Sequence, residues 1–562
     1  MITQYKSVIT GIALLLGNTL SVMAQQAADP IISAMQKEID RSIKELKIDK
    51  LPAPFYIDAR VVNINATNIQ ATLGSLMNYN STPYRNVYCS LLTGDYQKSN
   101  NNLLVDFPQG SYPQTMVFGT DEEAIRTCLW KQLDEKYKKG AEDYETKQSI
   151  IKQQALSAEE LSIPDFEKKE PATYFQQDVP IHIDMEKLKK YVMDASAVFK
   201  DNKNLIDSSV RLYIGDANSW YTNSEGSKVQ CPDKLVMLFI NLQGQAIDGE
   251  ELNQTTSLFY TSLEELPDNE TLKKMCLQQG ELFNARLQAP LIDESYCGPV
   301  LFEKDAVADL VNDYMVTPDK GILAKRKPIR SDEMNRYSGG SWLEGNQLEG
   351  MINKKVISRD LTLVSLSGTE TYQGKKLFGY YPIDAQGVAP DKELVLIQEG
   401  VLKNMLTNRF PTKVFRHSNG HARAAVNGSE PFLLPGVLKL SSKNPVAASS
   451  LKQKLIDAAK EEDYEYAYIV RKKAGENAEL LYRVNVQDGS ETLVRGAQIK
   501  DMSLKTFKRI LGVAQEEEIY NRSRHDVKMT FIVPRDILFE EVDVVKNNNI
   551  VLKKPYVVER PE

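Results

Sequence analysis

The chain contains few residues that could support metal or nucleophile chemistry, with only four histidines and five cysteines among 562 residues. His417 and His421 have the i, i+4 spacing that lets two imidazoles share a metal ion on a helix. Asn419 and Gly420 between them favour a turn instead. Three interpretations stay open: a polar loop, half of a metal site that needs a third ligand such as His182 or His525, or a peptide- or carboxylate-binding segment made of His417, Asn419, His421 and Arg423.

Other motifs for catalysis or phosphate binding are missing from the sequence. Neither glycine-rich phosphate-binding pattern occurs, and no histidine is followed by the glutamate that a zinc-binding helix would place next to it. The nearest string to a nucleophile turn, Gly339-Gly340-Ser341-Trp342-Leu343, lacks the final glycine. The cysteines include no C-x-x-C pair, and none lies beyond Cys297. They therefore form no metal cluster, and their spacing fixes no disulfide pairing.

Composition restricts the class of protein. With 42% hydrophobic and 26% charged residues, the chain is an ordinary globular one with room for two to four domains. A net charge of −7 argues against a nucleic-acid partner. Residues 1–24 predict a signal peptide cleaved after Ala24, because Lys6 precedes an apolar run that is too short to span a bilayer. We therefore expect an exported protein, periplasmic or secreted, with no membrane span after removal of the signal.

Two units of similar order are expected in the N-terminal half, at 25–130 and 181–296, with a charged helix and linker at 131–180 between them. The apolar spacing predicts helices at 28–47, 121–154, 184–200 and 271–288, the third with Asp184 as its N-cap. Strands are expected at 55–62, 68–77, 86–92, 208–214, 220–222 and 235–242. The common order of helix and then strands favours two related α/β modules.

Residues 297–562 predict a mixed, mostly β domain. Strands are expected at 361–366, 377–381, 394–397, 466–470, 480–486, 529–533, 542–545 and 551–557. Glu399-Gly400 and Asp488-Gly489 mark hairpin turns between apolar runs. Helices are expected only at 306–314, 449–459 and 504–511. The predicted fold class is therefore α+β, with α/β modules followed by this mostly β domain.

A set of short motifs in the C-terminal half occurs in the order found in one known family. The set comprises Gly298-Pro299-Val300-Leu301-Phe302-Glu303, Gly379-Tyr380-Tyr381-Pro382-Ile383-Asp384, and the segments 396–403, 418–423, 434–436, 493–496 and 534–542. Together they resemble the C-terminal domain of the TldD/PmbA (TldD/TldE) metallopeptidase family. Segments 35–42 and 221–226 are similar to the family more loosely, so the resemblance covers nearly the whole mature chain.

The resemblance implies a zinc peptidase fold, but it places unsuitable residues at the metal. Zinc-bearing members carry H-E-x-x-x-H shortly after the Gly-Pro-Val-Leu segment, with a distant cysteine as third ligand. Here Asn312 and Thr317 stand at the two histidine positions and Asp313 at the glutamate. Amide and hydroxyl groups are poor substitutes for neutral imidazoles at zinc. We therefore expect no cofactor, no catalytic residue at these degenerate positions and no bound metal.

The resemblance further implies the role of a zinc-less TldE/PmbA-like subunit, a pseudoenzyme that pairs with a zinc-bearing TldD-like subunit in peptide hydrolysis. A homodimer is the other pairing to be expected. Two alternatives remain open at this point. One is an autonomous metallopeptidase with relocated ligands such as His417, His421 or His525. The other is a non-enzymatic envelope protein that binds peptides.

Overall fold

The structure is a computed structural model that describes residues 29–107, 113–154, 156–337, 343–477, 479–500, 502–554 and 556. The predicted signal peptide (1–24) and residues 339–342 of the serine-containing string lie outside the described residues. Within the described part of the chain, no helix has the length and apolar character that crossing a bilayer would require. The predicted α+β class is confirmed.

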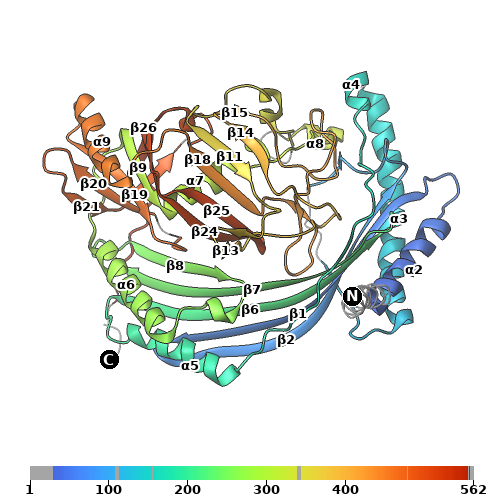
Figure 1. Ribbon diagram of the computed structural model, residues 1–562, viewed down its shortest axis with the longest axis horizontal. Coiled ribbons are helices and arrows are strands. Elements are labelled where there is room, and N and C mark those ends of the chain that lie inside the picture. The colour runs from blue at the N-terminus through green and yellow to red at the C-terminus, as the bar shows by residue number, and fades with distance from the viewer. Residues whose placement is uncertain are drawn as a thin grey trace, which may run out of the picture.

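One long, curved antiparallel sheet forms the N-terminal half (Figure 1). Two hairpins build its centre: β1 (Pro54–Thr72) with β2 (Ser75–Thr93), and β6 (Leu205–Asn223) with β7 (Lys228–Gln245). β1 pairs with β6 from Asp58↔Asn223 to Ala71↔Val210, so strands from both predicted modules share one sheet. The strand order is β4-β2-β1-β6-β7-β5, with β8 also paired to β7. The outer strands are β4 (Gln114–Thr115), β5 (Thr173–Phe175) and β8 (Glu251–Tyr260).

The strand breaks predicted inside β1 and β6 are wrong. Residues 63–67 and 215–219 continue these strands, and the β1–β2 turn lies at Leu73-Gly74, inside the predicted strand 68–77. Polar side chains support the longer strands because they bond across the sheet: Asn68 Nδ2 donates to Asn78 Oδ1 at 3.0 Å. Arg211 Nε likewise donates to Asn68 Oδ1 at 2.6 Å. No strand is predicted from the sequence at the position of β8.

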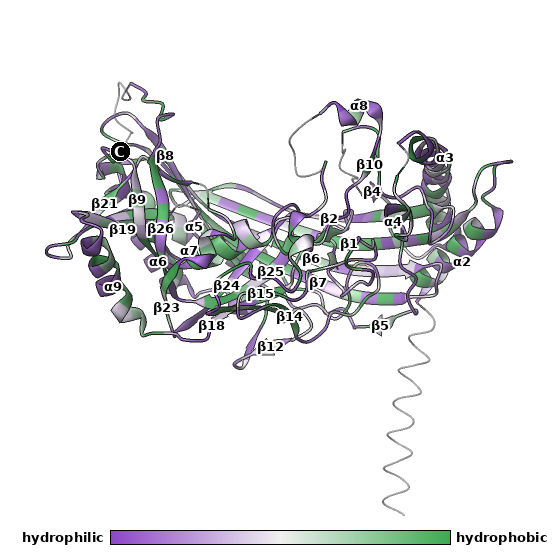
Figure 2. Cartoon of the chain, turned by 90° about the horizontal axis from the view of Figure 1, so that it is seen from above, coloured by the Kyte–Doolittle hydropathy of each residue, from purple (hydrophilic) through white to green (hydrophobic). Residues whose placement is uncertain are grey.

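Alternation along β1 determines what covers each face of the sheet. Ile57, Ala59 and Val61 pack against two helices, α2 (Pro30–Glu45) and α3 (Glu122–Gln154). Farther along the same face, Ile69 and Ala71 pack against α5 (Met185–Ser196) and α6 (Asn269–Gln288). Residues of even number, Val62 and Ile64, pack instead with Phe378 and Val426 of the C-terminal domain. The domain thus lies within the concave face of the sheet (Figure 1), whose strands alternate in hydropathy (Figure 2).

The helices predicted in the N-terminal half are confirmed. Asp184 caps α5, because its Oδ1 accepts a hydrogen bond from Lys187 N at 3.1 Å. Asp29 caps α2 in the same way through the amides of Ile31 and Ile32. The shorter elements of this half are β3 (Leu103–Leu104), α4 (Ala158–Leu161), η1 (Ala197–Phe199) and η2 (Leu263–Glu265).

Two sheets and a few short helices build the C-terminal domain. One sheet has the order β15-β14-β11-β18-β25-β24 and the other β21-β20-β19-β9-β26-β22, with β23 on β26. Their strands are β9 (Tyr296–Lys304), β11 (Leu361–Ser365), β14 (Leu394–Gln398), β15 (Val401–Leu402), β18 (Val437–Ser442), β19 (Tyr466–Lys472), β20 (Leu480–Asn485), β21 (Glu491–Val494), β22 (Ala497–Lys500), β23 (Ile510–Val513), β24 (Glu517–Arg524), β25 (Val527–Pro534) and β26 (Asp536–Lys546). Outside them are β10 (Ile329–Arg330), β12 (Thr371–Tyr372), β13 (Lys375–Lys376), β16 (Ala422–Arg423) and β17 (Phe432–Leu433). The helical elements are α7 (Asp305–Leu310), η3 (Val311–Met315), α8 (Asp332–Asn335), η4 (Gln347–Met351), α9 (Ala448–Glu461) and η5 (Thr506–Lys508).

Three predictions for this domain are wrong. Residues 377–381 form no strand, because they cross other backbone at Gly379. The helix expected at 504–511 is only the short η5, since Ile510 already pairs with Phe539 of β26. Residues 551–554 make no strand beyond an isolated bridge between Glu250 and Leu552. The turns at Glu399-Gly400 and Asp488-Gly489 are confirmed as hairpins.

Candidate functional site

A cavity of about 520 Å³ lies between the sheet and the C-terminal domain. Its sheet wall consists of residues that share one face because they are register partners across β1, β6 and β7. One row is Arg60, Tyr221 and Val229, and the next is Val62, Ser219 and Cys231. Successive side chains of β1 point to opposite faces of the sheet, and Arg60 lies on the face that carries Val62 and Ile64. It therefore points into the cavity.

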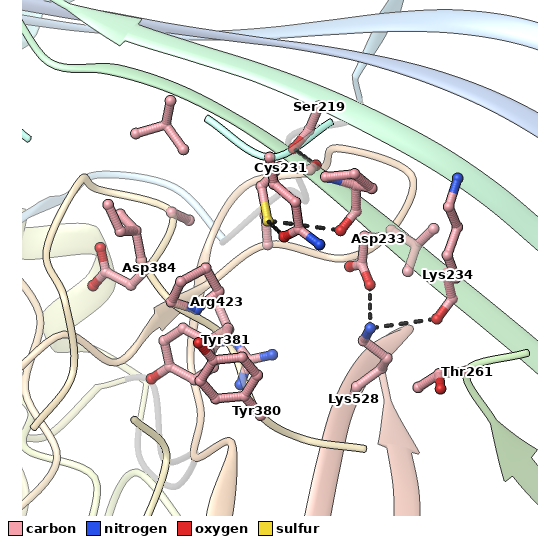
Figure 3. A pocket seen from close by; sticks show the side chains of 18 of the residues that line it. Ser219, Cys231, Asp233, Lys234, Thr261, Tyr380, Tyr381, Asp384, Arg423 and Lys528 are labelled. Carbon is pink, nitrogen blue, oxygen red and sulfur yellow. Dashed lines mark hydrogen bonds and ion pairs between the residues drawn. The ribbon is translucent and has the colours of Figure 1, made fainter. Parts of the chain in front are cut away.

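The opposite wall is the segment 376–385, which approaches β16 and β25. It depends on a close backbone crossing, since a Cβ added at Gly379 would lie 2.0 Å from the carbonyl oxygen of Gly436. Tyr381 is anchored here by its hydroxyl, which donates to Gly420 O at 2.6 Å. The crossing and the anchor place Tyr380 and Tyr381 at the cavity beside Arg423 of β16 (Figure 3).

Asp384 organises the turn that ends this segment. Its Oδ1 accepts hydrogen bonds from the amides of Gln386 and Val388 at 2.8 and 2.9 Å, and its Oδ2 accepts one from Ala422 N at 3.0 Å. Burial nonetheless raises the pKa of Asp384 to about 6, because the three backbone amides only partly offset the loss of solvent. Asp384 therefore ties the turn to β16 and holds a proton more readily than an exposed carboxyl.

The residues at the family's metal positions lie elsewhere: Asn312 and Asp313 are in the π-helical turn η3, which follows α7, and Thr317 comes just after it. Asn312 Nδ2 donates to Asp313 Oδ1 at 2.7 Å, and Asn312 Oδ1 is buried with no partner among the described residues. Asp313 opens onto a second cavity, of about 740 Å³, together with Asp309 and Glu479. Loss of solvent, then the Asp309 carboxylate, raise the pKa of Glu479 to about 7.

This donor set does not fit a zinc ion. It offers one amide, one hydroxyl and one carboxylate, and the amide already bonds the carboxylate. Zinc sites in proteins use imidazole, thiolate or carboxylate ligands in a closed tetrahedral set, or three such ligands with an open position. Only the Asp313 carboxylate is a ligand of this kind. Across the described ranges, no group of three or more His, Cys, Asp or Glu side chains is placed to hold a metal.

The four histidines do not converge on a common site. His182 is exposed in the segment before α5. His417 is exposed, and its Nδ1 lies 2.8 Å from Glu167 Oε1. His525 lies in the β24–β25 turn and stacks on Phe432, with 4.7 Å between the ring centroids. His421 is buried.

His421 and Asn419 hold their loop in place rather than facing the cavity. Burial, then the Arg423 charge, lower the pKa of His421 to about 3, so its ring is neutral. Its Nδ1 donates to Asn419 Oδ1 at 2.9 Å, and its Nε2 accepts from Ser365 Oγ at 3.0 Å. Asn419 is further bonded to the backbone of Thr407 and Met405. Of the four candidate peptide-binding residues, only Arg423 lines the cavity.

Comparison with known proteins agrees with this architecture. Residues 296–546 match the family model of the PmbA/TldA metallopeptidase C-terminal domain. The C-terminal domain is therefore similar to that of the TldD/PmbA family. A search of curated proteins finds no significant match. The TldD/PmbA relation therefore rests on the C-terminal domain and on the fold.

Solved structures with the TldD/PmbA-like fold cover most of the chain at low sequence identity. A Thermotoga maritima protein described as a candidate modulator of a DNA gyrase is 14% identical, with a TM-score of 0.57 over 91% of this chain and 99% of that one. TldE from Thermococcus kodakarensis is 13% identical, with a TM-score of 0.54 over 91% and 100%. A candidate DNA gyrase modulator from Bacteroides thetaiotaomicron is 11% identical, with a TM-score of 0.56 over 92% and 99%.

Sequence reasoning missed two polar residues of the cavity wall. Arg60 lies in a run of strand-forming residues, and its position between Ala59 and Val61 was the available signal for a buried cation. Asp384 was noticed only as part of a TldD/PmbA motif. Neither position could be connected to Arg423 from the sequence, because β1 and β16 are more than three hundred residues apart in the chain.

Proposed function

We propose that the chain is a zinc-less TldD/PmbA-type subunit that binds peptides and pairs with a zinc-bearing relative, which performs the hydrolysis. The observation that carries the proposal is the donor set at the degenerate motif. Asn312, Asp313 and Thr317 replace the ligands and base that the resemblance implies, and the carboxylate of Asp313 accepts a hydrogen bond from Asn312 Nδ2. The polar cavity between the sheet and the C-terminal domain supports the peptide-binding part.

An autonomous enzyme with relocated ligands has less support. His417, His421 and His525 each have a different neighbour, namely Glu167, Asn419 and Phe432. A catalytic zinc site needs three protein ligands around one ion. We therefore favour the paired, zinc-less role over the autonomous one.

The test compares the chain alone, a TldD-type protein with an intact H-E-x-x-x-H motif alone, and the mixture, on a fluorescence-quenched peptide. We expect no hydrolysis by the chain alone, co-elution of the two proteins on size exclusion, and faster hydrolysis by the mixture than by the partner. A partner in which the motif glutamate is changed to glutamine serves as the control, and its mixture should be inactive. A mixture no faster than the partner alone would contradict the proposal.

The proposed location is outside the cytoplasm, periplasmic or secreted. The support is the sequence of residues 1–24, with an apolar core between Lys6 and Ala24. N-terminal sequencing of the mature protein should begin at Gln25. A mature chain that still begins at Met1 would contradict export through this signal.

A further inference from the structure

Two buried arginines face the cavity from its opposite walls. Arg60 comes from β1 and is 8% exposed, and Arg423 comes from β16 and is 7% exposed. Both line the same cavity, and Figure 3 shows Arg423 there beside Tyr380 and Tyr381. A guanidinium cannot shed its charge at any ordinary pH, so burial of two of them requires compensation.

The hydrogen-bonding and stacking partners of these two side chains are neutral groups. Arg60 Nη2 donates to the carbonyl oxygen of Ala385, and its guanidinium lies 5.5 Å from the ring centroid of Tyr221. Arg423 lies 3.7 Å above the ring of Tyr381, with the carbonyl oxygens of Gly379 and Pro435 at 3.5 and 3.4 Å from Nη1. In the part of the chain that the structure describes, neither arginine forms an ion pair with a carboxylate.

The carboxylates that line the cavity are engaged elsewhere. Asp233 forms an ion pair with Lys528, and Glu265 accepts a hydrogen bond from the Thr261 hydroxyl at 2.5 Å. Asp384 receives three backbone amides, and its pKa is raised. The fourth, Glu370, is exposed at the rim. The charges of Asp58, Asp233 and Asp384 act on the two arginines through space. Among the described residues, however, no carboxylate forms an ion pair with either guanidinium, so both keep room for a carboxylate ligand.

We infer that Arg60 and Arg423 form a subsite that binds the carboxylate of a peptide, either its C-terminus or an acidic side chain. This inference rests on the proposed peptide-binding function and names the chemical class of peptide. A carboxylate between two guanidiniums would accept charge-assisted hydrogen bonds from both, which are stronger than bonds between neutral groups. A cavity of about 520 Å³ is large enough for a few residues of a peptide chain.

A purely structural role for Arg60 and Arg423 does not explain why the residues at these two buried positions are charged. The bond from Arg60 to Ala385 links the sheet to the C-terminal domain, and the stacking of Arg423 steadies Tyr381. Neutral side chains could perform both tasks without burying a charge. The test must therefore separate the loss of carboxylate binding from the loss of packing.

The first experiment uses the unaltered mature protein and four fluorescein-labelled decapeptides of one sequence. They end in a free carboxylate or an amide, and carry either glutamate or glutamine at one internal position. We expect at least one carboxylate to tighten binding roughly tenfold or more over the peptide that has neither. The amide series shows which of the two carboxylates is bound. Equal affinity for all four peptides overturns the inference and leaves the proposed function intact, whereas no binding by any of them contradicts the proposed function itself.

The second experiment measures the same peptides with Arg60→Gln and Arg423→Gln. Lys376→Gln is the matched control, because Lys376 lines the same cavity but is exposed. Each arginine variant should lose about tenfold in affinity for the preferred carboxylate peptide while its affinity for the neutral peptide and its melting temperature change little. Equal weakening toward charged and neutral peptides indicates a packing role and overturns the inference. The first experiment keeps the inference testable if a variant does not fold.

Discussion

Arg409 connects the sheet to the C-terminal domain, and its replacement gives the sharpest prediction about the fold around the cavity. The side chain is fully buried, and its guanidinium lies 4.9 and 4.3 Å from the ring centroids of Tyr56 and Phe166. It forms an ion pair with Glu225 at 2.6 Å and donates to the Glu167 carbonyl oxygen at 2.6 and 3.0 Å. One arginine thus joins β1, the linker and the β6–β7 turn to the domain that carries it.

Arg409→Met keeps most of the apolar volume and removes the charge. It leaves the Glu225 carboxylate buried with the Tyr96 hydroxyl at 2.9 Å and the Lys169 amide at 3.4 Å as its remaining donors. Breaking a buried ion pair by removing one partner costs about 3–5 kcal/mol. Because Glu225 keeps two donors, we expect a loss near the lower end, about 3 kcal/mol. Adding Glu225→Gln should recover part of this loss, since the unpaired charge is then gone.

Urea unfolding followed by circular dichroism measures these differences. The control is Arg509→Met, which breaks an exposed pair with Glu541 and should cost less than about 1 kcal/mol. The reasoning is refuted if Arg409→Met costs no more than the control. It is also refuted if Glu225→Gln makes the Arg409→Met protein less stable.

Three further predictions concern the walls of the cavity and its loop. The pKa of Asp384 is raised to about 6, so the folded state keeps a proton that the unfolded state loses near pH 4. The contribution of Asp384 to the free energy of unfolding therefore falls as pH rises from about 4 to 6. The free energy of unfolding of the unaltered protein, relative to that of Asp384→Asn, should therefore be higher at pH 4 than at pH 7 by up to about 3 kcal/mol. Parallel curves of stability against pH for the two proteins would contradict this. The pKa of His421 is lowered to about 3, so its effect on stability has the opposite pH dependence. Because the unfolded state takes up the proton first as pH falls, the contribution of His421 to stability is complete above about pH 6.5 and is lost below it. His421→Gln should weaken this acid sensitivity in calorimetric melts, and an unchanged pH dependence would count against it. Gly379→Ala should lower the stability measured in thermal melts by at least about 2 kcal/mol, because its Cβ would collide with the Gly436 carbonyl. The control Gly350→Ala should be nearly neutral, since no atom lies within 4 Å of the added Cβ. Equal effects of the two substitutions would show that the backbone crossing at Gly379 is not rigid.

Local signals in the sequence predicted much of the secondary structure. Asp184 caps a helix that begins where the apolar spacing indicates, and the acidic-glycine turns at 399–400 and 488–489 join strands as expected. These features depend on residues within a few positions of one another. They could be found because their hydrogen bonds are local.

Features that depend on distant residues could not be found in this way. Asn63 and Asn65 fall in the break predicted between two strands, but they lie within β1, where Arg85 and Ser81 of β2 donate hydrogen bonds to their side-chain oxygens. The union of the two modules in one sheet requires β1 and β6 to meet, which no local pattern encodes. The placement of Arg60 and Arg423 on the same cavity is non-local in the same sense. Sequence could identify the degenerate metal motif because that motif is contiguous.

Elemental analysis of the purified mature protein tests most directly whether the degenerate motif at Asn312, Asp313 and Thr317 holds zinc. Protein produced in zinc-supplemented medium, freed of any affinity tag and gel-filtered, should contain far less than one zinc per chain. Addition of a chelator should leave its melting temperature unchanged, because a structural or catalytic metal would contribute to stability. About one zinc per chain, removed by the chelator with a drop in melting temperature, would contradict the account.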